Sequence, residues 1–167
     1  DRLFNTDGTM RYPVTTIPGV TWIGEYFGDT MLVNGKVWPF MNAEPRVYRF
    51  RILNACSARI LTLTMDAVPI WQIGNECGLF DVPVLMKELV LAPAERADVL
   101  VDLRSYAGKT VNMKNQKIHA PFSNPANLLT PVMKLNVARK ASSQQGNAIP
   151  ASILGGRLAN LAPGTTQ

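Results

Sequence analysis

The residues whose types and spacing could do chemistry lie mainly in residues 91–103, LAPAERADVLVDL, where Glu95, Arg96 and Asp98 separate two apolar runs. Carboxylates beside an arginine can act in acid–base catalysis, but glycosidase-type hydrolysis needs two carboxylates facing each other across a cleft. Alternating apolar residues directly after Asp98 instead indicate a strand. We therefore expect a structural corner, in which Arg96 forms an ion pair with Asp98 or Glu95.

Metal and nucleophile chemistry have few candidates in this chain. His119 is the single histidine, and Cys56 and Cys77 are the two cysteines. A blue-copper site needs two histidines and a cysteine, and a catalytic zinc usually takes three protein ligands, so no metal site is predicted. Cys56 and Ser57 lie in the segment NACSAR without a second histidine that could complete a triad, which favours turn residues. The two cysteines could form one disulfide or remain small buried groups, and the sequence leaves both open.

Composition indicates one folded domain. The chain has 167 residues, of which 47% are hydrophobic and 17% charged, with a net charge of +5. Its basic residues are spread along the chain without a run of five or six like charges, so nucleic-acid binding is not expected. No apolar stretch approaches the ~20 residues that a membrane-spanning helix needs, and no signal segment is recognisable at the start.

The elements that must position these side chains are strands. In RVYRFRIL, Tyr48, Phe50 and Ile52 alternate with arginines, and the same period of two recurs in ILTLTM and PVMKLNVA. Asn34-Gly35 in TMLVNGKVWP predicts a hairpin with a two-residue turn. Shorter runs lie near residues 70–73, 86–91, 97–103 and 110–114. Eight or nine closely spaced strands without a helical stripe predict an all-β, antiparallel Greek-key sandwich or barrel with less than about a tenth helix, against a usual third.

Four segments, in this order, carry a resemblance: DTMLVNGKVWP, YRFRILNACSAR, WQIGNECGLFDVPV and LAPAERADVLVDL. They are similar to the middle, cupredoxin-like domain of bacterial three-domain multicopper oxidases, such as spore-coat laccases and bilirubin oxidase. The resemblance runs from about residue 1 to 138. It implies a linker over residues 1–28 from a first domain, a cupredoxin-like domain over 29–138, and a linker over 139–167 toward a third domain.

The resemblance also implies a function for the parent protein. Such enzymes couple one-electron oxidation of phenolic or similar donors to reduction of dioxygen to water, using a type 1 copper and a trinuclear copper cluster. Their copper ligands come from His-x-His and His-Cys-His motifs in the first and third domains, which this chain lacks. The resemblance therefore implies a copper-free spacer domain, inactive by itself, whose partners are the other two domains. Secretion, a periplasmic site or a spore surface is the location that it favours.

Site residues follow from the same resemblance. The corner of Glu95, Arg96 and Asp98 is expected to be structural and remote from copper. The segment before the first hairpin and the loop before the last strand lie toward the substrate cleft in this family. The resemblance thus implies four residues as a cleft lining: Tyr26, Phe27, His119 and Phe122.

An alternative reading is a free-standing β-sandwich that serves binding or assembly without a redox role.

A middle domain that lacks its neighbours would expose apolar faces. We therefore expect either self-association or packing of residues 139–167 onto such a face.

Overall fold

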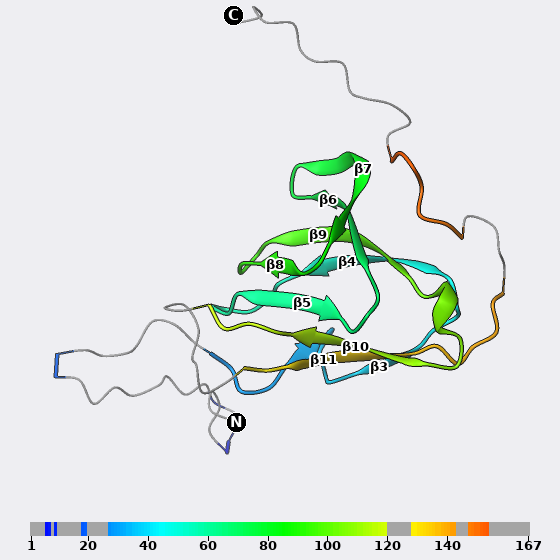
Figure 1. The fold of residues 1–167 in the computed structure, drawn as a ribbon. Helices are drawn as coiled ribbons and strands as arrows, with labels where there is room; N and C mark the ends of the chain where they lie inside the picture. Colours follow the sequence, from blue (N-terminus) through cyan, green and yellow to red (C-terminus); the bar gives the residue numbers. More distant parts are fainter. Residues whose placement is uncertain are drawn as a thin grey trace, which may run out of the picture.

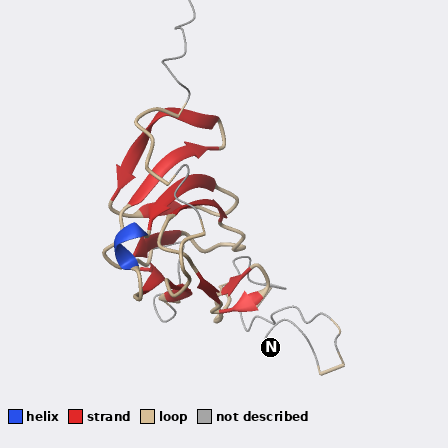
Figure 2. Cartoon of the chain, turned by 90° about the vertical axis from the view of Figure 1, so that its right-hand side faces the viewer, coloured by secondary structure: helices blue, strands red, loops and turns tan. Residues whose placement is uncertain are grey.

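The computed structural model describes residues 6–7, 9, 18–19, 27–119, 128–142 and 147–153. Within these residues the chain forms strands β1 to β11 and a single turn of 3-10 helix, η1 (Arg104–Tyr106). Figures 1 and 2 show the strands arranged in layers, with little helix. The predicted all-β class is confirmed. No helix in the described part of the chain is long and apolar enough to cross a membrane.

A five-stranded sheet forms one layer, in the order β3-β11-β10-β5-β8. Its members are β3 (Phe40–Asn42), β11 (Pro131–Asn136), β10 (Thr110–Asn115), β5 (Leu61–Met65) and β8 (Leu89–Leu91). All neighbours are antiparallel except β11 and β3, which pair in parallel. The strands predicted in ILTLTM and PVMKLNVA are confirmed here as β5 and β11.

A four-stranded antiparallel sheet forms the second layer, in the order β4-β9-β6-β7. Its members are β4 (Val47–Leu53), β9 (Arg96–Asp102), β6 (Ile70–Asn75) and β7 (Gly78–Met86). The run expected near residues 86–91 was wrong in its bounds, because it contains the end of β7 and all of β8. Asp81 and Pro83 interrupt the alternation of β7, and an edge strand tolerates proline because one side of its backbone is unpaired.

A short hairpin of β1 (Leu32–Val33) and β2 (Lys36–Val37) precedes the sheets. Asn34 and Gly35 have φ values of 50° and 77°, as the two central residues of a primed turn require. The predicted hairpin is therefore confirmed.

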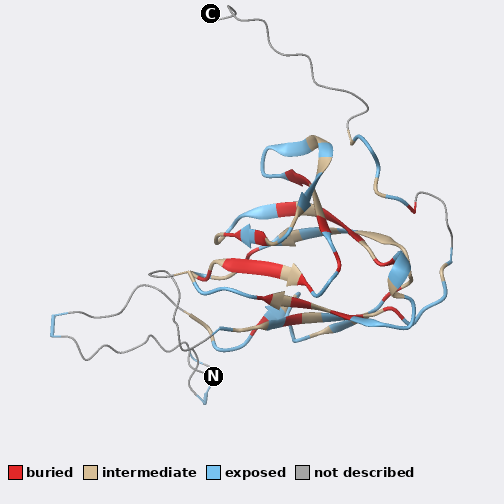
Figure 3. Cartoon of the chain, viewed as in Figure 1, coloured by how far each residue is buried: buried red, intermediate tan, exposed pale blue. Residues whose placement is uncertain are grey.

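The core lies between the two sheets. Leu63, Leu89 and Leu135 enter it from the five-stranded sheet, and Val99 and Val101 from the four-stranded sheet. Figure 3 shows buried residues concentrated along the strands of the sandwich. Burial of each such side chain stabilises the fold by about 1.5–3 kcal/mol. Because a register slip of one residue would move a strand's apolar side chains to solvent, the period-two alternation decides which face of each strand packs in the core.

Candidate functional site

The corner between β8 and β9 differs from the prediction in its pairing. Arg96 forms its ion pair with Glu76 in the β6–β7 turn, with Nε 3.9 Å from Oε1, and its backbone N–H donates to the same carboxylate. Asp98 accepts from Arg49 on β4, whose Nε lies 2.8 Å from Oδ1 and whose Nη2 donates to Oδ2. The expected pairing of Arg96 with Asp98 or Glu95 was therefore wrong. Its cause is the sheet register, which brings β4 and the β6–β7 turn beside β9.

Glu95 has a local task in the same corner. Its Oε2 accepts the backbone N–H of Ala92 at 2.7 Å, while its own N–H donates to the Ala92 carbonyl at 3.1 Å. The turn holds Ala94 at φ 69°, a left-handed conformation that costs a non-glycine residue energy. Arg96 Nη1 donates to the Ala94 carbonyl at 2.9 Å. Together with the Arg49–Asp98 pair, these bonds give Glu95, Arg96 and Asp98 each a partner within the fold.

Asn54 is a buried residue that sequence reasoning missed. It has 0% exposure, and its Nδ2 donates to the carbonyls of Arg59 at 2.8 Å and Leu91 at 2.9 Å. Its Oδ1 accepts the Cys56 N–H at 3.0 Å. Its backbone also bonds to the corner, through the Glu95 carbonyl and the Ala94 N–H. Asn54 thus joins three segments, the NACSAR loop, β8 and the corner, at one buried point.

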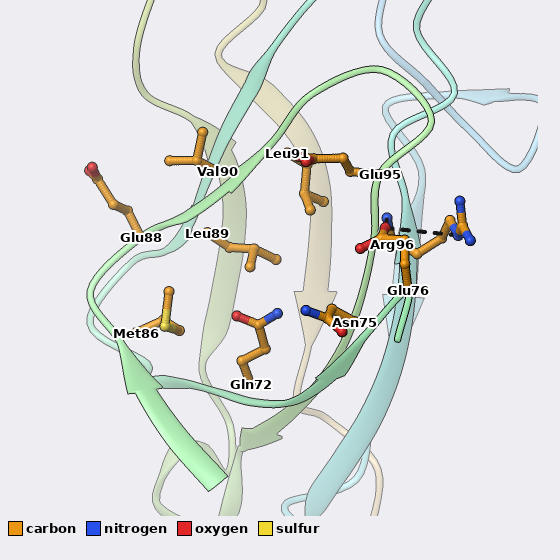
Figure 4. Close-up of a pocket in the computed structure, with 10 residues that line it drawn as sticks. All are labelled: Gln72, Asn75, Glu76, Met86, Glu88, Leu89, Val90, Leu91, Glu95 and Arg96. Carbon is orange, nitrogen blue, oxygen red and sulfur yellow. Dashed lines mark hydrogen bonds and ion pairs between the residues drawn. The ribbon is translucent and has the colours of Figure 1, made fainter. Parts of the chain in front are cut away.

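A pocket of about 240 Å³ lies beside the corner. Two of its three carboxylates have basic partners, since Glu76 pairs with Arg96 and Glu88 Oε1 accepts from Lys117. The hydrogen bond from the Arg96 N–H lowers the pKa of Glu76. Figure 4 shows Gln72 and Leu89 among the side chains between the strands. The complete lining is Gln72, Asn75, Glu76, Met86, Glu88, Leu89, Val90, Leu91, Glu95 and Arg96.

Of the four residues expected in a substrate cleft, Phe27 and His119 are described, whereas Tyr26 and Phe122 lie outside the described residues. The guanidinium carbon of Arg59 lies 5.6 Å from the Phe27 ring centroid, within the range of a cation–π contact. Arg59 also donates from Nη2 to the Gly28 carbonyl at 2.8 Å. Arg59 is 4% exposed, so it ties the segment before β1 to the body of the domain.

His119 is held at the same end of the five-stranded sheet. Its Nε2 lies 2.6 Å from Oγ1 of Thr62 on β5, a residue with 0% exposure. The Thr62 N–H donates to Oδ1 of buried Asn115 at 2.9 Å. Phe27 contacts Arg59 and His119 contacts Thr62. These two partners are only three residues apart, at the start of β5, so both contacts lie at the same end of the strand. Whether they line a cleft stays a prediction.

The two cysteines are free thiols in the structure. Cys56 is half-buried, and burial raises the pKa of its thiol, with Arg59 opposing that shift. Cys77 is exposed in the β6–β7 turn, where its N–H donates to Oδ1 of Asn75 at 3.0 Å. The two cysteines thus form no disulfide, but the expectation of small buried groups was wrong for Cys77, which is exposed, and Cys56 is only half-buried.

The layered sandwich and its strand order define a cupredoxin-like domain, and comparisons with known proteins agree. No family model matches the chain. A laccase from Bacillus stratosphericus is 42% identical over 124 residues, which cover 69% of this chain and 24% of the laccase. A laccase from Bacillus subtilis is 38% identical over 122 residues, with the same two coverages. The crystal structure of the multicopper oxidase McoA from Aquifex aeolicus superposes with a TM-score of 0.75 at 28% identity, covering 100% of this chain and 35% of McoA.

This chain therefore belongs to the multicopper oxidases. It spans about a quarter of the length of the curated laccases that it matches.

The donor atoms of the chain can be compared with a copper centre. The 167-residue sequence has one histidine, whereas a type 1 centre takes two together with a cysteine. Among the described residues, no three His, Cys, Asp or Glu side chains are grouped as a metal site. The sequence given therefore does not by itself supply the donor set of a type 1 centre.

Proposed function

We propose that this chain is the middle, copper-free domain of a laccase-like multicopper oxidase. The parent enzyme would couple one-electron oxidation of phenolic or similar donors to reduction of dioxygen to water. The observation that carries the proposal is a domain-length match to laccases in a sequence with a single histidine. A multicopper oxidase that contains this domain needs its copper ligands elsewhere in the polypeptide. The domain would hold the ligand-bearing domains in place.

An apolar surface on the domain supports contact with neighbouring domains. Leu32, Val37, Trp38 and Phe40, here called the hairpin patch, are 54%, 52%, 54% and 66% exposed. Trp38 also has φ 42°, an uncommon backbone conformation for a bulky residue. Neighbouring large apolar residues exposed on one part of a surface mark an interaction site more often than scattered ones do. We assign the hairpin patch to contacts with the other cupredoxin domains of the same protein.

The extent of the reading frame tests this proposal. The gene is expected to continue on both sides of the 167 codons, with His-x-His motifs before and after and a His-Cys-His segment after. A start codon directly before Asp1 together with a stop codon after Gln167 would refute it and would favour a free-standing module. The relatives do not favour that alternative, because each aligns to this chain over only part of its length.

A further inference from the structure

The chain does not leave the domain directly after β11. Residues 139–142 and 147–153, here called the strap, run along one side of the sandwich toward β7, as Figure 1 shows in orange on the right. At the near end, the Arg139 N–H donates to the Ala43 carbonyl at 3.0 Å. Further on, the Ser142 N–H and Oγ both donate to Glu44 Oε2 at 2.9 Å, and these two bonds lower the pKa of Glu44.

The middle of the strap is fixed by Asn147, which is 9% exposed. Its Oδ1 accepts the N–H of Val47, the first residue of β4, at 2.6 Å. Because the neighbouring Arg46 carbonyl accepts from Leu103, the Val47 N–H points away from β9, toward the open edge of the sheet. Asn147 thus satisfies a donor on an edge strand, which would otherwise be open to pairing with another chain.

A charged pair holds the backbone of the same residue. Arg104 donates from Nη1 to the Asn147 carbonyl at 3.1 Å. Asp102 in turn orients Arg104, with Oδ2 2.6 Å from Nη2 and Oδ1 2.9 Å from Nε. Asn147 is therefore held by hydrogen bonds to both its side chain and its main chain.

The far end of the strap reaches the opposite edge of the same sheet. The Ile153 N–H and the Ser152 Oγ both donate to the Asp81 carbonyl of β7, at 2.8 and 3.2 Å. Crossing from β4 to β7 covers three strand spacings, about 14 Å, and Asp81 also lies five residues along β7 from Met86, which the register places at the Val47 end of the sheet. Six residue steps from Asn147 reach at most about 20 Å, so the strap crosses by a nearly direct route.

The outer face of the four-stranded sheet, between β4 and β7, holds buried apolar residues outside the core. Val99 and Val101 belong to the core, so Leu100 between them points to the other face of the sheet, yet Leu100 is only 8% exposed. Ile73 on β6 is likewise 4% exposed and stands outside the core cluster. Buried residues on an outer sheet face need a covering layer.

We propose that the strap, latched by Asn147, is an integral outer layer of the four-stranded sheet. It covers Leu100 and Ile73, closes the β4 edge and carries the exit of the chain from the end of β11 to the side of β7. That face is then occupied by the chain itself and is not available as a surface for other domains. The inference rests on contacts within this chain and does not depend on the proposed copper-free role.

Hydrogen–deuterium exchange on the 167-residue chain tests the strap. In the unmodified chain, the amides of Ser142 and Ile153 are expected to exchange more slowly than in an unstructured peptide. Asn147→Ala removes the acceptor of the Val47 N–H and should speed exchange across the strap and at Val47 about tenfold, which corresponds to about 1.4 kcal/mol. Amides of the core strand β9 should keep their rates.

Asn147→Asp is the matched control, because it keeps an oxygen acceptor for Val47 and should keep the slow exchange. Strap amides that exchange at peptide rates in the unmodified chain would overturn the proposal, as would equal rates in Asn147→Ala. Should that variant fail to fold, Glu44→Ala gives the same test at the near end. Faster exchange at Ser142 then supports the strap, and an unchanged rate refutes it.

Discussion

Replacement of Asn54 tests whether one buried amide holds the NACSAR loop, β8 and the corner together. In Asn54→Ala, the carbonyls of Arg59 and Leu91 lose their donor, and both residues are buried, with 4% and 3% exposure. Each buried polar group left without a partner costs about 1–3 kcal/mol. The Cys56 N–H belongs to a half-buried residue and can form a hydrogen bond with water in the variant, so it adds less to the loss of stability. The expected loss is therefore about 2–6 kcal/mol of the 5–15 kcal/mol that stabilise a typical domain.

Urea unfolding followed by tryptophan fluorescence measures this loss. The matched control is Asn75→Ala, because Asn75 accepts the Cys77 N–H in the same local geometry on an exposed turn. The control should cost about 0.5 kcal/mol or less, as exposed substitutions usually do. A loss below about 1 kcal/mol for Asn54→Ala, equal to that of the control, would show that the buried amide does not join the three segments.

Three further outcomes follow from the charged and apolar surfaces. Arg96→Ala should leave the urea midpoint unchanged within error, because its pair with Glu76 and its bond to the Ala94 carbonyl are both solvent-exposed; a clear loss would show a role beyond these two contacts. Arg104 hydrogen bonds lower the pKa of Asp102, so its stabilisation is present above the unfolded pKa near 3.8 and is lost as pH falls through the lower folded value. Melting temperatures should therefore fall below about pH 4, less steeply in Asp102→Asn, and equal slopes would contradict this cause. Phe40→Ser should lower any self-association of the chain in light scattering without changing its melting temperature, whereas unchanged association would remove the hairpin patch as an interface.

The fold could be predicted because its signals are local. Alternation in VYRFRIL places Tyr48, Phe50 and Ile52 against the core, and the structure places them there. Asn34-Gly35 is adjacent in sequence and defines its own turn. β7 was not predicted, because Asp81 and Pro83 interrupt its alternation and its stability comes from pairing with β6.

The contacts of the candidate site could not be predicted, because they join residues far apart in sequence. Arg96 lies 20 residues from Glu76, and Arg49 lies 49 residues from Asp98. The sequence shows two arginines on β4 and three carboxylates on or next to β9, but the register alone decides which of them meet. A single asparagine such as Asn54 has no periodic signal, since its partners are defined only by tertiary structure.

Copper binding tests the central claim most directly. The 167-residue chain and the product of its complete reading frame would be loaded with copper under the same conditions, with metal measured by elemental analysis and the type 1 centre by visible absorption. A copper-free middle domain predicts no stoichiometric copper and no intense blue band in the chain, and both in the complete protein. Stoichiometric copper with a blue band in the isolated chain would contradict the assignment.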